Sequence, residues 1–404
     1  MMHTLFYRAI CRLTWLVITA GFLYAYPAFS APDLGKIKLP PGFKIEIFAD
    51  LSVQKGETWL GPRMMALDAD GHLYVSATRS HQVLMLADID GDGVADRVEV
   101  IAENLNAPHG LAFVDGALLI ANQDGVVKLT KVGGKWSKPQ PFITNLPTGG
   151  HTLKTIQLGA DGFLYINVGS SCNVCVEADP LRATMLRYTK DGEPAGALTT
   201  LGRHQQSAIW ARGLRNSQGF AWHPKTGAMY ATNNGADNRS GTRGGAVNDE
   251  LPPEHLNLVE PGKHYGWPYC WADPERQNMQ VQDPNFVGEE GFCMGAAAVA
   301  MTFRAHTTPI GIAFLNKTNW PPAYKTDAIV ALHGSWNRKQ PAGYQLVRVK
   351  FAGDKPVGQE VFATGWLEGN QAWGRPVDVI VGKDGALYTS DDKLNVIYRI
   401  YYQR

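Results

Sequence analysis

Apolar and polar residues alternate in short runs along most of this chain, and a turn separates each pair of runs. One unit recurs six times: an apolar run, a turn built on Asp-Gly or Lys-Thr-Gly, and a second run with Tyr or Leu near its middle. The fifth copy carries a longer insertion in place of the short turn. Alternation with a period of two predicts β-strands, and a short turn between two such runs predicts a hairpin. The first strands are expected at residues 62–67, 108–113, 151–156, 217–222, 309–314 and 376–380.

Six stacked hairpins predict an all-β, six-bladed β-propeller. An amphipathic hairpin cannot bury its own apolar face, so neighbouring copies stack, and a closed ring leaves few exposed edges. Residues 42–51 also alternate and are expected to pair with residues 396–401 to close the ring. The alternative is a two-sheet sandwich, but the copy number and the even early spacing favour the propeller.

The spacing between copies widens from the third copy onward. The insertions, above all residues 233–308, predict long loops on one face of the ring. Long loops in a compact fold usually carry function.

The first 31 residues resemble a secretory signal. Arg8 and Arg12 precede an apolar run at 13–26, and small residues follow at the two positions that determine cleavage. A retained membrane anchor is the alternative, but the run is short for a full span. We therefore expect cleavage near Ala31, a propeller domain at 32–404, a periplasmic or secreted product, and no membrane span after cleavage.

Composition fits this interpretation. The 404 residues include 43 Gly and 24 Pro, and the formal net charge is +1. Abundant Gly, Pro and aromatic residues suit a turn-rich β protein. A charge near zero gives no reason to expect nucleic acid as a partner.

Four cysteines would remain in the mature chain, and an even count in an exported protein favours disulfides. Cys172 and Cys175 could form a local bridge, a redox pair or half of a metal site, whereas Val176 stands where a haem attachment would need His. No second close pair completes a zinc site. We expect two structural bridges, Cys172–Cys175 and Cys270–Cys293.

Polar groups concentrate between residues 212 and 269. Two guanidinium groups, several amides, a Gly-rich turn and the acidic pair Asp249-Glu250 lie there between short apolar runs. Arginine offers a flat fork of donors to carboxylates, and carbonyl and carboxylate oxygens suit calcium. The stretch would suit a polyanionic ligand beside a hard cation. The alternative is a polar loop whose turn residues are satisfied locally.

A second acidic stretch, Asp88 to Asp96, has carboxylates at alternate positions with glycines between them. This pattern is similar to a calcium loop, although the distal Glu and flanking helices of an EF-hand are missing. A structural calcium ion or a charged hairpin would each explain it.

Histidines recur at related places in three copies: His109, His151 and His333. A His at the start of an inner strand points towards the central channel, where a base is useful. A structural role is the alternative for any one of them.

Aromatic and cationic residues gather in two loops, 333–338 and 366–375. Trp beside Arg suits stacking on a flat conjugated ligand, and packing at the propeller rim is the alternative.

Taken in order, these motifs resemble one family: the exported quinoprotein sugar dehydrogenases that use pyrroloquinoline quinone (PQQ), especially their sorbosone dehydrogenase-like branch. The motifs that carry the resemblance are Gly150-His151 and residues 169–175, 212–219, 248–251, 265–268, 333–338 and 374–378. They span most of the mature chain in the family's order. The resemblance implies a six-bladed propeller with PQQ and calcium at one end of its channel.

The resemblance also implies roles for individual residues. His151 matches the general base, and the backbone carbonyls of Gly235 and Ala236 fall where calcium is held. Residues that match cofactor-binding positions are Arg215, Asn216, Gln218, His333, Arg338 and Arg375. Ala236 replaces a Pro, and His333 a Lys, of the glucose-oxidising branch, which speaks against glucose as the substrate.

The implied activity is oxidation of an aldose or a related sugar such as sorbosone, with PQQ as the hydride acceptor, a His base and calcium as a Lewis acid. An electron acceptor such as a cytochrome or a quinone would then reoxidise the cofactor. Two alternatives are a non-redox propeller that binds a sugar or a protein, and a calcium-dependent lactonase-type hydrolase.

Overall fold

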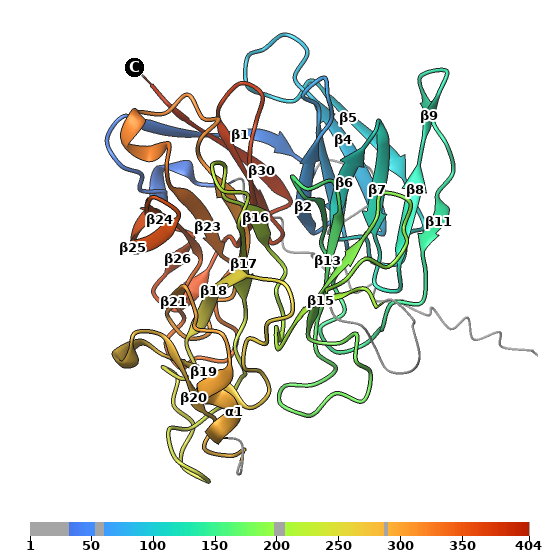
Figure 1. The fold of residues 1–404 in the computed structure, drawn as a ribbon. Coiled ribbons are helices and arrows are strands. Elements are labelled where there is room, and N and C mark those ends of the chain that lie inside the picture. Colours follow the sequence, from blue (N-terminus) through green and yellow to red (C-terminus); the bar gives the residue numbers. More distant parts are fainter. Residues whose placement is uncertain (1–31, 53–59, 198–206, 287–289, 404) are drawn as a thin grey trace, which may run out of the picture. The chain divides into compact units, whose positions relative to one another are not determined.

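Six four-stranded antiparallel sheets form the blades of a β-propeller in the computed structural model (Figure 1). The structure describes residues 32–52, 60–197, 207–286 and 290–403. The six sheets confirm the predicted fold, and the sandwich alternative is wrong. The expected signal segment, 1–31, lies outside the described residues.

The blades follow the chain in order. Blade one contains β2 (Pro62–Leu67), β3 (Leu73–Ala77), β4 (Gln82–Ala87) and β5 (Arg97–Ala102). Blade two contains β6 (Leu111–Val114), β7 (Ala117–Ala121), β8 (Val126–Leu129) and β11 (Gln140–Ile143). Blade three contains β12 (Ile156–Leu158), β13 (Leu164–Val168), β14 (Thr184–Tyr188) and β15 (Ile209–Arg212). Blade four contains β16 (Phe220–Trp222), β17 (Met229–Asn233), β18 (Glu254–Val259) and β21 (Met301–Phe303). Blade five contains β22 (Pro309–Phe314), β23 (Ala328–Leu332), β24 (Gln345–Ala352) and β25 (Lys355–Ala363).

The sixth blade joins the two ends of the described chain. Its strands are β28 (Pro376–Val381), β29 (Leu387–Asp391), β30 (Val396–Tyr402) and β1 (Phe43–Asp50). β1 pairs antiparallel with β30, from Phe43 opposite Tyr402 to Asp50 opposite Val396. This pairing confirms the predicted closure of the ring.

Apolar side chains fill the space between neighbouring blades. One buried cluster combines Leu119 and Ile143 of blade two with Ile166 and Leu186 of blade three. Such contacts explain why a hairpin with an unburied face is stable only as a member of the ring.

Glycines sit where the innermost strands approach one another most closely. A Cβ atom on Gly110 would lie 2.4 Å from the backbone nitrogen of Ile156, and one on Gly219 would lie 1.7 Å from the carbonyl oxygen of Ile310. Both glycines occupy the same place in their repeats. Any larger residue would push two blades apart at the central axis.

The first strands of blades two to four begin three to five residues later than predicted. Gly110 donates its N–H to the carbonyl of Lys154 in the next blade, so the regular ladder of blade two begins only at Leu111. The residues that precede these strands are polar and take part in the site described below.

Insertions after the third copy form the predicted long loops. The largest lies around β19 (Cys270–Asp273), β20 (Met279–Gln282) and α1 (Glu290–Gly295), at the lower end of Figure 1. Both expected disulfides, Cys172–Cys175 and Cys270–Cys293, are present.

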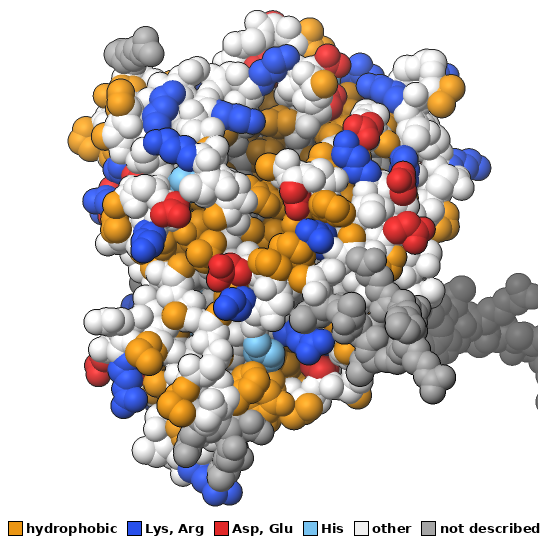
Figure 2. Space-filling view, in the orientation of Figure 1, with side chains coloured by type: hydrophobic (Ala, Val, Ile, Leu, Met, Phe, Trp, Pro, Cys, Tyr) orange, Lys and Arg blue, Asp and Glu red, His pale blue; other side chains and the backbone are white. Residues whose placement is uncertain are grey.

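Smaller elements complete the fold. They are η1 (Leu34–Lys36), β9 (Lys131–Val132), β10 (Lys135–Trp136), η2 (Pro274–Arg276), η3 (Pro322–Tyr324), β26 (Leu367–Glu368) and β27 (Gln371–Ala372). Among the described residues, no helix has the length and apolar character needed to cross a membrane. Acidic and basic side chains are interspersed on the face shown in Figure 2.

Candidate functional site

The predicted site residues gather at one end of the ring because of how each blade is wound. The first strand of a blade starts, and its antiparallel second strand ends, at the same end of the sheet. His151 therefore lies beside Ser170, and its N–H donates to the Ser170 carbonyl at 2.8 Å. In the same way the backbone N–H of Asn234 donates to the Asn216 carbonyl at 3.0 Å.

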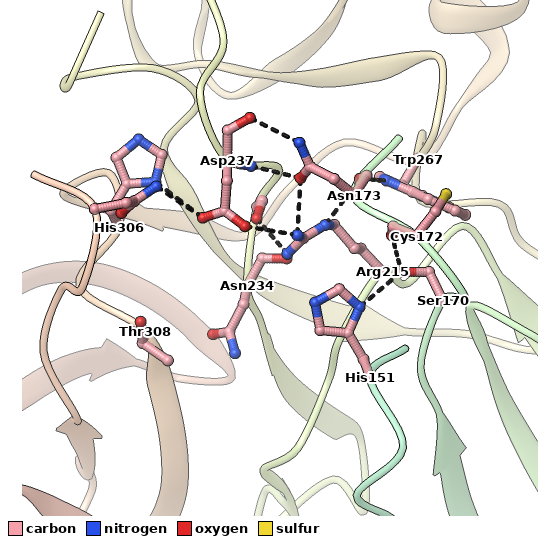
Figure 3. Close-up of polar contacts among 12 residues, drawn as sticks. His151, Ser170, Cys172, Asn173, Arg215, Asn234, Asp237, Trp267, His306 and Thr308 are labelled. Carbon is pink, nitrogen blue, oxygen red and sulfur yellow. Dashed lines mark hydrogen bonds and ion pairs between the residues drawn. The ribbon is translucent and has the colours of Figure 1, made fainter. Parts of the chain in front are cut away.

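His151 has a defined proton position. Its Nδ1 lies 2.8 Å from the hydroxyl of Ser170, and that hydroxyl donates to the carbonyl of Cys172 at 2.7 Å (Figure 3). Because the single hydroxyl hydrogen is used on the carbonyl, the Ser170 oxygen accepts a hydrogen from Nδ1. The Nε2 atom of His151 therefore keeps its lone pair and is able to accept a proton.

The surroundings of His151 keep the ring neutral. Burial, followed by the positive charge of Arg215, lowers the pKa of His151 to about 4, although Asp237 acts in the opposite direction. At neutral pH the imidazole is uncharged, which is the state that a general base requires.

Arg215 lies buried beside His151 and uses every N–H it has. Nε donates to the Asn173 carbonyl at 3.0 Å, and Nη1 donates to the carbonyls of Asn234 at 3.4 Å and Gly235 at 2.6 Å. Nη2 donates to Asn173 Oδ1 and to Asp237 Oδ2, both at 2.9 Å (Figure 3). An arginine has five N–H donors, and all five point at protein acceptors. Arg215 thus ties together two loops, whereas the sequence led us to expect a cofactor ligand.

Asn173 and Asp237 complete this network, and Asn173 was not among the predicted site residues. The N–H of Asp237 donates to Asn173 Oδ1 at 2.7 Å, and Asn173 Nδ2 donates to the Asp237 carbonyl at 2.9 Å. Trp267 donates its indole N–H to the Asn173 carbonyl at 3.1 Å. Asn173 lies inside the Cys172–Cys175 motif, whose cysteines were the residues that the pattern pointed to.

A second polar cluster forms around Asp392, which directly follows β29. Its carboxylate accepts from Arg63 at 2.7 Å, from Arg375 at 2.9 Å and from His333 at 3.1 Å. The Arg63 side chain is 11% exposed, and its buried Nε has no hydrogen-bond partner among the described residues. The side chain of Arg375 is 29% exposed.

Asp392 stays ionised in this cluster. Burial alone would raise its pKa, but the hydrogen bond from His333 and the charges of Arg63 and Arg375 outweigh burial and hold that pKa well below its ordinary range. Sequence reasoning missed both Asp392 and Arg63. The available signal was positional, because Ser170, Asn234 and Asp392 each follow the second strand of a blade by one or two residues.

Gln218 joins the two clusters. Its amide nitrogen donates to Asn216 Oδ1 at 3.3 Å, and its amide oxygen accepts from Arg63 Nη2 at 3.0 Å. The predicted residues Asn216, Gln218, His333 and Arg375 therefore lie in one connected network with Arg215.

Oxygen atoms near Gly235 and Ala236 suit a hard cation. Asn234 Oδ1 is buried without a hydrogen-bond partner among the described residues, and Figure 3 shows its amide turned away from Arg215. Ala236 is buried, and the N–H of Gly235 donates to the Glu254 carboxylate. Burial raises the pKa of Glu254 to about 7. The Gly235 carbonyl already accepts one hydrogen bond from Arg215, which leaves one lone pair for a ligand.

Arg338 lies apart from these contacts. Its guanidinium donates to the carbonyls of Asp249, Ala305 and Gln340 and to the Glu250 carboxylate. Hydrogen bonds from Arg304 and then Arg338 lower the pKa of Glu250 to about 2. In the described structure Arg338 thus holds the acidic pair Asp249-Glu250 in place through hydrogen bonds.

Of the two interpretations of the tryptophans, packing at the rim and stacking on a ligand, each fits one residue. Trp366 is fully buried and donates to the Tyr398 hydroxyl at 3.3 Å, as the packing alternative requires. Trp336 is 76% exposed and is available for stacking.

The remaining candidates lie in local networks. Nδ1 of the fully buried His109 lies 3.2 Å from the Thr155 hydroxyl, in keeping with a structural role. Carboxylate oxygens of Asp88, Asp90 and Asp92 lie within 4.8 Å of one another, an arrangement that suits either a charged turn or a calcium loop.

Fold and site together define a six-bladed propeller with a connected polar network at one end of its ring. A family model described as TrAA12-like matches residues 41–403, and the chain belongs to this family.

Among its relatives is a pyrroloquinoline quinone-dependent pyranose dehydrogenase of Coprinopsis cinerea, 23% identical over 397 residues. The match covers 84% of this chain and 52% of the enzyme, so the chain spans about half of that protein. An aldose sugar dehydrogenase of Escherichia coli is 25% identical over 182 residues, 44% of each chain.

Solved structures share the fold. The holo form of the PQQ domain of the Coprinopsis cinerea pyranose dehydrogenase matches with a TM-score of 0.75 and 19% identity, covering 90% of this chain and 97% of that one. A calcium structure of a Trichoderma reesei enzyme of Carbohydrate-Active Enzymes Family AA12 matches with a TM-score of 0.76 and 19% identity, covering 93% and 99%.

Proposed function

We propose that this protein is an exported oxidoreductase that oxidises an aldose or a related sugar, sorbosone among them, with PQQ as hydride acceptor and calcium as a second cofactor. One observation carries the proposal: a neutral His151 whose Nε2 keeps a lone pair, in the same polar network as an excess of guanidinium groups. The related PQQ-dependent dehydrogenases support the redox class.

The side chains present fit both cofactors. PQQ carries three carboxylates, which guanidinium groups bind well. Arg63 has a buried Nε without a described partner, and the Arg375 side chain beside it is 29% exposed. Asn234 Oδ1 and the carbonyls of Gly235 and Ala236 are the oxygen type that calcium prefers. When bound, PQQ would supply the acceptor for a hydride and calcium would polarise it.

The chain's own residues supply the proton chemistry. Nε2 of His151 accepts the proton of the sugar hydroxyl, and the Nδ1–H bond to Ser170 holds the ring in place during the transfer. The negative charge of Asp237 favours the imidazolium that results. Exposed Trp336 offers an aromatic face to the sugar or the cofactor.

Two further parts of the proposal lie outside the site. Residues 1–31 act as the export signal, so the enzyme works in the periplasm or outside the cell. A separate carrier, such as a cytochrome or a quinone, reoxidises the cofactor.

The test is a titration of purified apoprotein with PQQ in the presence and absence of calcium, followed by absorbance. We expect saturation at one PQQ per chain that depends on calcium, and dye-linked oxidation of at least one sugar in a panel. His151→Gln should still bind PQQ but lose turnover. Absence of saturable PQQ binding would refute the proposal, and hydrolysis of a lactone without PQQ would place the protein among the hydrolases.

A further inference from the structure

We propose that the small ring closed by the Cys172–Cys175 disulfide is the positioning element of the site, because one residue in it sets the proton position on His151 and the next holds Arg215. The inference rests on the proposed function only for the role of His151 as base. Its main consequence concerns the apoprotein and is measurable without cofactor or substrate.

The first half of the argument concerns the carbonyl of Cys172. It accepts the hydroxyl hydrogen of Ser170 at 2.7 Å, so the Ser170 oxygen is free only to accept from His151 Nδ1 at 2.8 Å. If the carbonyl turned away, the hydroxyl could donate to Nδ1 instead. The proton of His151 would then move to Nε2, and the base would lose its lone pair.

The second half concerns Asn173, which lies inside the ring. Its carbonyl accepts from Arg215 Nε and from Trp267, and its side-chain oxygen accepts from Arg215 Nη2 and the Asp237 N–H. Its side-chain nitrogen donates to the Asp237 carbonyl. Five hydrogen bonds thus converge on one residue (Figure 3).

The disulfide adds a covalent restraint to a segment that is otherwise held by hydrogen bonds from loops and side chains. Described residues 169–183 lie between β13 and β14 and form no strand or helix. Without a backbone ladder, a loop samples many conformations. A covalent link between Cys172 and Cys175, only three positions apart, restricts the two residues between them and the carbonyl of Cys172.

The second disulfide provides a matched control. Cys270 and Cys293 are 23 positions apart, and the backbone N–H of Cys270 donates to the Gly266 carbonyl. Closing a longer loop stabilises a fold more than closing a short one. Loss of the Cys270–Cys293 disulfide should therefore lower the stability of the fold more, and loss of the Cys172–Cys175 disulfide should disturb the site more.

The experiment uses full-length apoprotein labelled with ¹⁵N at histidine, with the His151 signal assigned from its loss in His151→Gln. Ring ¹⁵N shifts at neutral pH report which nitrogen carries the proton. We expect the Nδ1–H form for His151 in the wild type and in the Cys270→Ser/Cys293→Ser variant. In Cys172→Ser/Cys175→Ser the Nε2–H form should rise to about half, since two hydroxyl orientations become available.

A third variant separates the two halves of the argument. Asn173→Ala keeps the disulfide and the Cys172 carbonyl, so the Nδ1–H form of His151 should persist while the Arg215 contacts are lost. In reconstituted enzyme, loss of the Cys172–Cys175 link should lower kcat on the order of 10- to 100-fold with little change in KM, as misplaced reacting groups do. If the double variant does not fold, gentle reduction and alkylation of folded Cys270→Ser/Cys293→Ser apoprotein opens the Cys172–Cys175 link instead.

An unchanged His151 proton position in Cys172→Ser/Cys175→Ser would overturn the inference. So would an equal shift in the Cys270→Ser/Cys293→Ser control, because it would show a general loss of structure. If the shifts follow the prediction but no preparation binds PQQ, the proposed function fails and the positioning role stands.

Discussion

Two polar clusters share one end of the propeller, and they are built in opposite ways. In the Arg215 cluster (Asn173, Arg215, Asn234, Gly235 and Asp237), one cation is surrounded by enough acceptors to use all of its N–H groups. The Asp392 cluster (Arg63, His333, Arg375 and Asp392) surrounds one anion with more donors than it can accept. In the first cluster every guanidinium hydrogen is used, and in the second at least one buried N–H has no described partner.

The difference indicates a division of labour. Arg215 and Asp237 balance each other's charge, so their cluster shapes the site. Arg63 and Arg375 together outweigh the single charge of Asp392, so their cluster retains positive charge for an anionic ligand. Removing one partner of a buried ion pair leaves the other charge uncompensated in the interior. Removing a partly exposed cation leaves no such buried charge when a second cation remains. The two clusters should therefore respond differently to the same kind of mutation.

The largest expected effect is on stability at Arg215. Arg215→Met should lower the free energy of unfolding by about 3–5 kcal/mol, because the 20% exposed Asp237 would lose its buried cation and the carbonyls that Arg215 binds would lose their donors. Arg375→Met is the matched change in the other cluster and should cost less than about 1 kcal/mol, since Arg63 still balances Asp392. Urea unfolding of both apoproteins tests the contrast, and equal losses would abolish the division of labour.

The next largest effect should be on cofactor affinity. Arg375→Met should weaken PQQ binding by about 1.5–3 kcal/mol, roughly 10- to 150-fold in Kd, as expected for a charge-assisted hydrogen bond. Calorimetric titration of PQQ into apoprotein with calcium would measure it. An Arg375→Met protein that binds PQQ as tightly as the wild type would show that the cofactor's carboxylates lie elsewhere.

The pH dependence of turnover should distinguish the clusters more finely. The pKa of His151 is lowered to about 4, so its Nε2 stays able to accept a proton from pH 7 down to about pH 5, and kcat/KM should fall only as the pH approaches 4. Because the charge of Arg215 contributes to this lowering, Arg215→Met should move the acid limb to higher pH. Arg375→Met should leave the limb in place. Profiles of kcat/KM from pH 3.5 to 8 would show whether both variants shift alike, which the proposal does not allow.

The smallest expected effect belongs to Ser170. Ser170→Ala removes the acceptor for Nδ1–H without changing charge, so His151 would divide its proton between both nitrogens. The competent fraction falls, and kcat should drop about two- to tenfold with PQQ affinity unchanged. Ser170→Thr, which keeps the hydroxyl, should restore most of the rate. Failure of that rescue would assign the loss to packing.

Much of the fold was predictable because its signals are local. The six hairpins follow from short-range alternation and turn residues. The pairing of residues 42–51 with the last strand was expected from closure of the ring, and the even cysteine count predicted two disulfides without fixing which cysteines pair. The starts of blades two to four were misjudged because polar residues there bond across to the next blade, as Gly110 does with Lys154.

The site was predictable in its residue types but not in its partners. His151, Asn216, Gln218 and Arg375 do lie in one network, as their motifs suggested. Arg215 and Arg338 were expected to bind a cofactor, yet their described contacts are with the protein itself. A guanidinium group in a sequence shows that donors exist, and it does not show which acceptors lie within reach.

The chain's own alternation of apolar and polar residues determined a ring of six blades, since each hairpin has one face that only a neighbour can cover. The closed ring decided which charged groups are paired within the protein and which can still bind a ligand. Arg63 meets Asp392 across 329 positions of sequence, and Arg215 meets Asn173 across 42. Electrostatic balance depends on such distances in space, and no local pattern encodes them.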